Sequence, residues 1–208
     1  MPNRLCVATP TTQRQMQRRS RSIIAVLSIP IAVALVFGVG AAIRGHEGSS
    51  SLTLEASLSD RKLSVMRDGE TIGSYPIAIG SPTHPTPPGF YRIKTIVWNP
   101  DWIPPDQPWA RGKAPAGPGS ADNPMRTVKI FFREPDFYIH GTNNPKSLGE
   151  AASHGCLRMD PNQAAEVALM VMDNSGITRD WDWVKGILHI GETRAVRLQV
   201  AAPFTITN

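Results

Sequence analysis

The chain has 208 residues and a formal net charge of +5, but the charge is unevenly distributed. Residues 1–44 hold six arginines and no acidic residue, which leaves 16 basic and 17 acidic residues in the rest of the chain. Because the excess charge belongs to one end, and no nucleic-acid-binding motif is present, we expect no nucleic-acid partner. The length predicts one domain with a sizeable core, plus additional segments.

The N-terminal part has the pattern of a basic tail followed by a membrane segment. Residues 23–43 are 21 consecutive uncharged residues, enough for a helix to cross a hydrocarbon core of roughly 30 Å. Five arginines precede this run and only Arg44 follows it, so residues 1–22 are predicted to be a cytoplasmic tail and the rest of the chain to lie outside. A cleaved signal peptide, with a cleavage region near residues 40–42, is the alternative, but the length of the run favours an uncleaved anchor.

A polar linker at residues 44–51 precedes residues 52–201, whose alternation of apolar and polar residues predicts a mostly β domain. Asp68-Gly69 lies between two alternating runs and indicates a β-hairpin with a type I′ turn. One helix is expected to begin at Asp160-Pro161, with aspartate as N-cap and proline as first residue, and to end at 174–176. Residues 177–185 are expected to form a loop or short turn. Strands are predicted at residues 52–56, 61–67, 71–80, 89–98, 127–132 and 136–140, followed by a closing hairpin of 186–191 and 194–200.

Residues 99–124 have no clear period and are rich in proline and glycine. A loop of this length inside a domain is usually functional or disordered, and its tryptophans, Trp102 and Trp109, argue against disorder. We expect either a lid over a cleft or an ordinary surface loop held by two aromatic anchors.

The chemistry of the chain is concentrated between Tyr138 and Met159, which contains His140, His154 and Cys156. A thiolate is a strong nucleophile, and a nearby imidazole can take its proton or hold it as an ion pair. Gly155 permits a tight turn before the cysteine, so that the N–H groups of residues 155 and 156 can face a developing oxyanion. The residues predict a Cys/His acyl-transfer site, although they do not decide which histidine is the base.

Two other interpretations apply to the same residues. A single cysteine is most often a small buried hydrophobe and a single histidine a structural group. Against this, Cys6 precedes the predicted membrane segment, so Cys156 has no partner, and an unpaired cysteine in an exported domain suggests reactivity. Zinc bound by Cys156, His140 and His154 is the other alternative, but His-x-Cys matches usual zinc spacing poorly. We therefore expect neither a metal nor another cofactor.

The pattern His140-Gly141, followed after a loop by Ser153-His154-Gly155-Cys156, resembles the signature of the L,D-transpeptidase catalytic domain family (YkuD-like). The resemblance covers roughly residues 50–200 and implies a β-sandwich with one short helix and a cleft over the His-Gly-Cys turn. Many members carry asparagine two places after the cysteine, where this chain has Arg158.

The resemblance also implies the activity, in the bacterial cell envelope, on peptidoglycan stem peptides. Cys156 would attack the carbonyl at the L-centre of a diamino acid and release terminal D-alanine. An amine of another stem would then take the thioester to give a 3→3 cross-link, or a different acceptor, such as a lipoprotein amine, would be attached. His140 would be the base and then the acid. An L,D-carboxypeptidase using the same site, and a catalytically silent wall-binding module, are the alternatives.

The remaining positions of the motif receive supporting roles in this interpretation. The carbonyl of Gly141 would orient the imidazole, and Ser153 and His154 would shape the cleft. The N–H groups of Gly155 and Cys156 would form the oxyanion hole. Arg158 shares a side with Cys156 if the segment is extended, and would pair with a carboxylate of the substrate.

Overall fold

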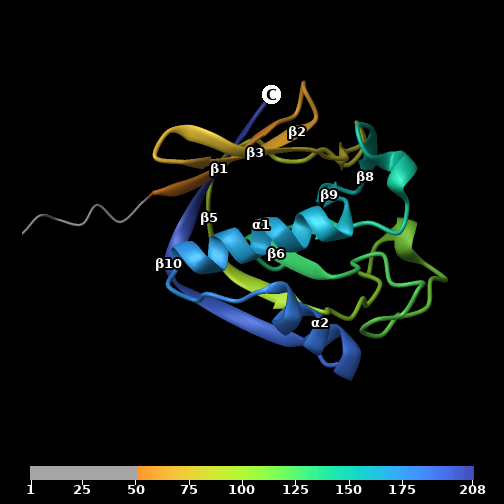
Figure 1. Ribbon diagram of the computed structural model, residues 1–208. Coiled ribbons are helices and arrows are strands. Elements are labelled where there is room, and N and C mark those ends of the chain that lie inside the picture. Colours follow the sequence, from red (N-terminus) through yellow and green to blue (C-terminus); the bar gives the residue numbers. More distant parts are fainter. Residues whose placement is uncertain (1–50) are drawn as a thin grey trace, which may run out of the picture. The chain divides into compact units, whose positions relative to one another are not determined.

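The centre of the fold is one eight-stranded sheet with the strand order β3-β2-β1-β10-β5-β6-β7-β9 (Figure 1). It is seen in the computed structural model, which describes residues 51–208. Neighbouring strands are antiparallel except for β1 with β10 and β7 with β9, which are parallel. The strands are β1 (Leu52–Ser57), β2 (Lys62–Arg67), β3 (Glu70–Pro76), β5 (Gly89–Trp98), β6 (Val128–Arg133), β7 (Phe137–Gly141), β9 (Leu157–Met159) and β10 (Arg194–Thr207), and the short β4 (Ile79–Gly80) and β8 (Ala151–Ser153) pair separately.

The two edges of the large sheet are brought together by the chain that follows β3. Ala78 and Arg158 of β9 exchange both of their backbone hydrogen bonds, each 2.9 Å long. Because β9 is the last strand of the order and Ala78 continues from the first, the sheet curls towards a closed barrel, and the edge strand β9 is covered. The segment that carries the predicted motif is thereby fixed on both sides.

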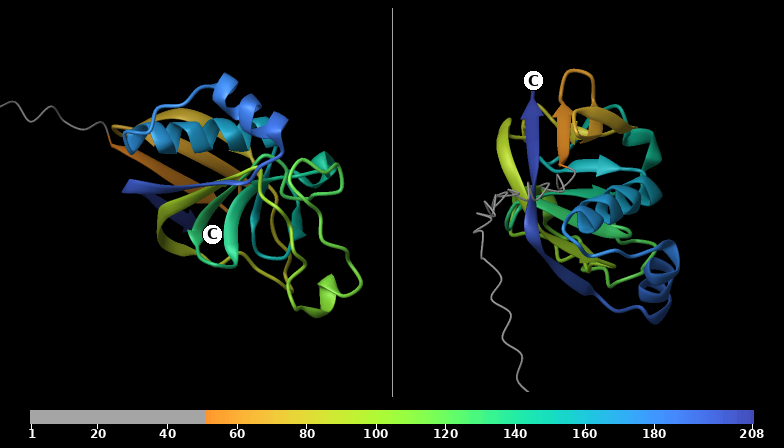
Figure 2. Two further views of the ribbon diagram at one scale, coloured as in Figure 1. Left: turned by 90° about the horizontal axis from the view of Figure 1, so that it is seen from below. Right: turned by 60° about the vertical axis from the view of Figure 1, so that its left-hand side comes forward.

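Two helices lie on one face of the sheet (Figure 2). Helix α1 (Pro161–Asn174) packs against β6, β7 and β10. As predicted, Asp160 caps it, because its side chain accepts hydrogen bonds from the backbone N–H groups of Asn162 and Gln163. Alternate residues of β6, β7 and β9, including Ile130, Ile139 and Leu157, are fully buried in the core with α1. The opposite face of these three strands is therefore available for a site.

The second helix, α2 (Trp181–Ile190), was not predicted. Residues 177–185 were expected to form a loop or turn and residues 186–191 a strand, and both expectations are wrong. Asp180 caps the helix through the N–H of Trp183, and the side chains of Val184 and Ile187 are buried together on one helical face. The run is too short for the 3.6-residue period to be distinguished from alternation. β10 consequently has no hairpin partner just before it and pairs with β1 and β5.

The mostly β class, the hairpin at Asp68-Gly69 and the helix at Asp160-Pro161 are confirmed. None of the helices in residues 51–208 is long and apolar enough to cross a bilayer. The predicted tail at residues 1–22, the apolar segment at 23–43 and most of the linker lie outside the described residues.

Candidate active site

The site is built on the face of β6, β7 and β9 that points away from α1. His140 on β7 pairs with Lys129 on β6 and with Arg158 on β9. Side chains two residues apart on a strand share a face, so a second row lies beside the first. The two rows face one cavity, with Lys129, His140 and Arg158 in the first and Phe131, Tyr138 and Cys156 in the second.

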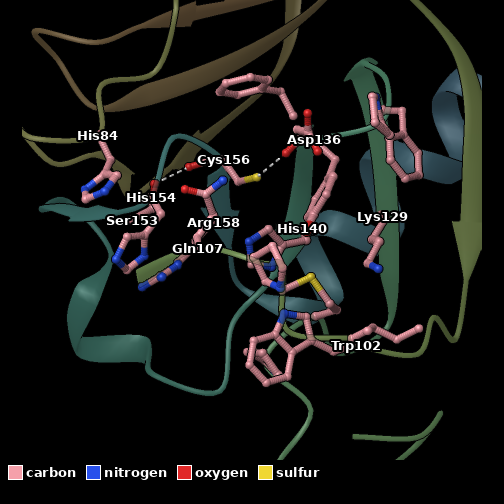
Figure 3. Close-up of a pocket in the computed structure, with 18 of the residues that line it drawn as sticks. His84, Trp102, Gln107, Lys129, Asp136, His140, Ser153, His154, Cys156 and Arg158 are labelled. Carbon is pink, nitrogen blue, oxygen red and sulfur yellow. Dashed lines mark hydrogen bonds between the residues drawn. The ribbon is translucent and has the colours of Figure 1, made fainter. Parts of the chain in front are cut away.

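This cavity has a volume of about 590 Å³ and contains the labelled residues of Figure 3. Its other wall comes from the loop expected to be a lid or a surface loop, which contributes Trp102 and Trp109. The backbone of Trp102 exchanges two hydrogen bonds with Ala116, and the buried Asn123 side chain donates to the carbonyl of Pro100 at 2.7 Å. The loop is thus ordered by its own contacts and encloses the cavity against the sheet.

The turn before Cys156 is fixed by glycine and by hydroxyl groups. Gly155 has φ of +107°, a region that side chains disfavour, and a Cβ atom there would lie 2.8 Å from the ring of Phe137. The hydroxyl of Ser153 accepts a hydrogen bond from the N–H of Gly155 at 3.1 Å and donates to the carbonyl of Cys156 at 2.6 Å. Thr86 donates to the carbonyl of Gly155 at 3.0 Å. These bonds hold the cysteine in one orientation.

One of the predicted oxyanion donors is engaged in this turn. The N–H of Gly155 was expected to face the oxyanion, but it donates to Ser153 instead. In this conformation the N–H of Gly155 is directed into the turn and not into the cavity, and its role as an oxyanion donor stays a prediction. Gly155 therefore acts through its backbone conformation, and Ser153 acts by fixing the turn.

Cys156 is half-buried, and its thiol donates a hydrogen bond to the carbonyl of Asp136 at 3.3 Å. Burial raises the pKa of the thiol to about 11, although the N–H of Tyr138 and the charges of Arg158 and Lys129 act in the opposite direction. The sulfur is therefore protonated at neutral pH in the free protein.

His140 is 3% exposed and lies between two cationic side chains in its row. Burial, with the charges of Arg158 and Lys129, lowers the pKa of its imidazole to about 3, and the Gly141 and Pro124 carbonyls act in the opposite direction. Its Nδ1 atom has no hydrogen-bond partner within residues 51–208. A neutral imidazole thus faces the cavity together with a neutral thiol. The sequence left open whether His140 and Cys156 form an ion pair. The lowered pKa of His140 and the raised pKa of Cys156 favour two neutral groups.

His154 occupies a different place, at the exposed rim of the same cavity. Its ring stacks on Trp109 with centroids 3.9 Å apart and meets His84 edge-on at 4.8 Å. Burial and the neighbouring His84 lower the pKa of His154. Because this ring is held in an aromatic stack and His140 lies in the row beside Cys156, the geometry favours His140 as the proton acceptor.

Gly141, which directly follows His140, is required by packing. A Cβ atom there would lie 2.8 Å from Cβ of Arg126 and 3.2 Å from the backbone of Pro161 at the start of α1. The close approach sets how β7 meets the helix and therefore where the imidazole lies.

Sequence reasoning gave no role to Lys129 or Tyr138, both of which face the cavity. Alternation was the available signal, because Tyr138 lies two residues before His140 on the same strand. Lys129 is a charged residue within the mostly apolar strand β6, but its place beside His140 depends on the pairing of β6 with β7. Within residues 51–208, the His, Cys, Asp and Glu side chains form no group of three or more that is placed to hold a metal ion.

Comparison with known proteins identifies similar chains. The profile of the L,D-transpeptidase catalytic domain family, YkuD, matches residues 52–185. YkuD of Bacillus subtilis, provisionally named an L,D-transpeptidase, is 29% identical over 126 residues, which are 60% of this chain and 63% of that protein. The Bacillus licheniformis protein of the same name is 29% identical over 125 residues, with the same two coverages. The chain thus spans less than two thirds of the length of these relatives. The structure of an L,D-transpeptidase from Mycobacterium smegmatis matches with a TM-score of 0.49 at 18% identity. The match covers 76% of this chain and 59% of the Mycobacterium smegmatis chain.

Proposed function

Because the chain belongs to the L,D-transpeptidase catalytic domain family, we propose that it transfers acyl groups between peptidoglycan stem peptides through a cysteine thioester. The observation that carries this proposal is the placement of His140 on β7 and of Cys156 directly before the neighbouring strand β9, with both residues lining one cavity. Cys156 is the nucleophile and His140 is the base and then the acid.

The first half-reaction begins from the two neutral groups. The Cys156 sulfur attacks the carbonyl carbon at the L-centre of the diamino acid, its proton passes to His140, and the carbonyl electron pair moves to oxygen. When the C–N bond breaks, His140 gives the proton to the leaving nitrogen, and D-alanine departs from a thioester. Because both groups are neutral beforehand, the proton moves during the attack and not before it.

The second half-reaction reverses these roles. An acceptor amine from another stem attacks the thioester carbonyl and loses a proton to His140. The C–S bond breaks, and the proton returns to the sulfur of Cys156. The product is a new amide between two stems, and both groups regain their starting protonation states.

The N–H of Cys156 is the backbone donor that we assign to the oxyanion, because the N–H of Gly155 is taken by Ser153. Such a donor typically contributes about 3–4 kcal/mol to the transition state. Arg158 lies in the same cavity and supplies a positive charge for a carboxylate of the stem. Trp102 and Trp109 form the apolar wall on which a sugar or peptide packs.

We also propose that residues 23–43 anchor the chain in the inner membrane, which places the catalytic domain outside the cytoplasm next to its substrate. The uncharged run and the arginines before it support this arrangement. A cleaved signal would lead to a secreted enzyme with the same site.

The test is to incubate the purified full-length chain with a disaccharide-tetrapeptide and to identify products by mass. Cross-linked dimers indicate the transpeptidase, and tripeptides with free D-alanine indicate the L,D-carboxypeptidase, which uses water as acceptor at the same site. If neither product forms and Cys156 gives no adduct with a carbapenem, the chain is a wall-binding module and the proposal is wrong. The variant Cys156→Ala is the control in every arm.

A further inference from the structure

Two cations flank the proposed base. Lys129 and Arg158 are the cross-strand neighbours of His140, on its two sides in the same row. Neither forms an ion pair with an acidic side chain within residues 51–208, where the pairs are Arg61 with Glu150 and Lys185 with Asp182. The Lys129 ammonium is instead held by the carbonyl of Asp101 at 2.9 Å and lies 5.3 Å from the centroid of the Tyr138 ring.

This arrangement is costly without a ligand. Both side chains are half-buried, and a partly buried charge without an ion-pair partner is unfavourable, although the charge of Asp101 partly offsets that of Lys129. The cavity as a whole is also positive, because Lys113, Lys129 and Arg158 line it against two carboxylates, Asp101 and Asp136. An anionic group of the ligand would balance the excess.

The chemistry of the leaving group supplies such an anion. In the proposed reaction His140 protonates the nitrogen of the departing amino acid, so this nitrogen must lie against the imidazole. The carboxylate of an α-amino acid is attached one carbon from that nitrogen. Neighbouring positions across a sheet are about 5 Å apart, and a group one carbon beyond the nitrogen therefore reaches the side chains beside His140.

We propose that Lys129 and Arg158 bind the carboxylate of the amino acid that leaves, and so select substrates whose scissile bond is followed by a single residue with a free carboxyl end. The proposal rests on the function proposed above and adds the residues that recognise the departing amino acid. Arg158 offers a planar fork with several donors, and Lys129 a point charge. Together they reach both oxygens of one carboxylate.

Three substrates show whether the two cations bind the C-terminal carboxylate or the side-chain carboxylate of the diamino acid. The first is the disaccharide-tetrapeptide with its natural free end, the second carries a C-terminal carboxamide, and the third has the free end but an amidated carboxyl group on the side chain of the diamino acid. Release of the last residue is followed by mass for the full-length chain and for Lys129→Gln, Arg158→Gln and Lys94→Gln. Lys94 is an exposed residue of β5 outside the cavity and serves as the matched control.

We expect kcat/KM for the free end to exceed that for the C-terminal carboxamide by about 10- to 100-fold, the size of a charge-assisted hydrogen bond lost at a partly buried site. Each of the two cavity variants should lower this ratio at least threefold, mainly by slowing the free-end substrate, whereas Lys94→Gln should leave it unchanged. The third substrate should behave as the first.

A ratio near one in the unmodified protein would overturn the proposal without any variant, and so would unchanged ratios in both cavity variants. A loss confined to the third substrate would assign the cations to the diamino acid and also overturn it. If the unmodified protein releases nothing from all three substrates, the proposed function itself is wrong, and this proposal falls with it.

Discussion

Cys156 should react slowly with iodoacetamide at neutral pH in the free protein. With a thiol pKa of about 11, roughly one molecule in ten thousand carries a thiolate at pH 7, against one in a hundred for the ordinary value of 9.0. The hundredfold loss is partly offset because a more basic thiolate is more nucleophilic, by roughly six- to tenfold for two units of pKa. The net expectation is alkylation about 10-fold slower than that of an unperturbed cysteine.

The sign of the pH dependence follows from the same shift. Because the pKa of Cys156 is raised, the alkylation rate should climb steadily from pH 6 to beyond pH 9, with no plateau in the neutral range. The assay is mass spectrometry of the Cys156 peptide after timed exposure, which separates it from Cys6. The same peptide in the urea-unfolded chain is the unperturbed reference.

A plateau between pH 6 and pH 8 would refute this reasoning, particularly if His140→Gln removed it. Such a plateau is the signature of a thiolate already paired with an imidazolium. It would mean that a Cys156 thiolate paired with a His140 imidazolium is the resting state, and that burial is not the main influence on the pKa of the thiol.

Three further predictions concern the motif. Cys156→Ala should fold normally and form no acyl adduct by intact-protein mass, and a persisting adduct would show that another residue is the nucleophile. Gly155→Ala should lower the free energy of unfolding by about 2–4 kcal/mol, because of the positive φ and the contact with Phe137. Gly112→Ala, at φ of +76° in open space, should cost only about 1–2 kcal/mol in the same urea titrations, and equal losses would contradict the packing argument. The His140 pKa is lowered to about 3, so only the unfolded chain binds a proton between about pH 6.5 and pH 3, and stability should fall by up to about 1.4 kcal/mol per pH unit as the solution is acidified. His140→Gln should flatten that acid slope in urea titrations, and an unchanged slope would place the titration elsewhere.

The parts of the fold that local chemistry determines were predictable. Asp68-Gly69 specifies a tight turn by itself, and β2 and β3 pair across it. Asp160 and Pro161 likewise carry the start of α1 in their own side chains. α2 was missed because its apolar residues match either period over so short a run, and burial against the rest of the core decides between them.

The site shows the same division. His140 and Cys156 stand out because a motif of adjacent residues marks them, whereas the neighbours that set their pKa values do not. Lys129 and Arg158 meet His140 only through the register in which β6, β7 and β9 pair, and a slip of one residue would turn both cations to the other face. The protonation states of His140 and Cys156 could therefore not be predicted before the pairing of β6, β7 and β9 was known.

The two cations link recognition to catalysis in this arrangement. In the free protein the charges of Lys129 and Arg158 lower the pKa of His140, which makes the imidazole a weak base. A carboxylate bound between them, as proposed, would offset both charges and raise that pKa towards its ordinary value. The imidazole would then accept the thiol proton more readily when a substrate with a free carboxyl end is bound. A site that is poorly reactive when empty and more basic when filled limits side reactions of an unpaired thiol, and such side reactions would be a hazard for Cys156 if the domain is exported as proposed.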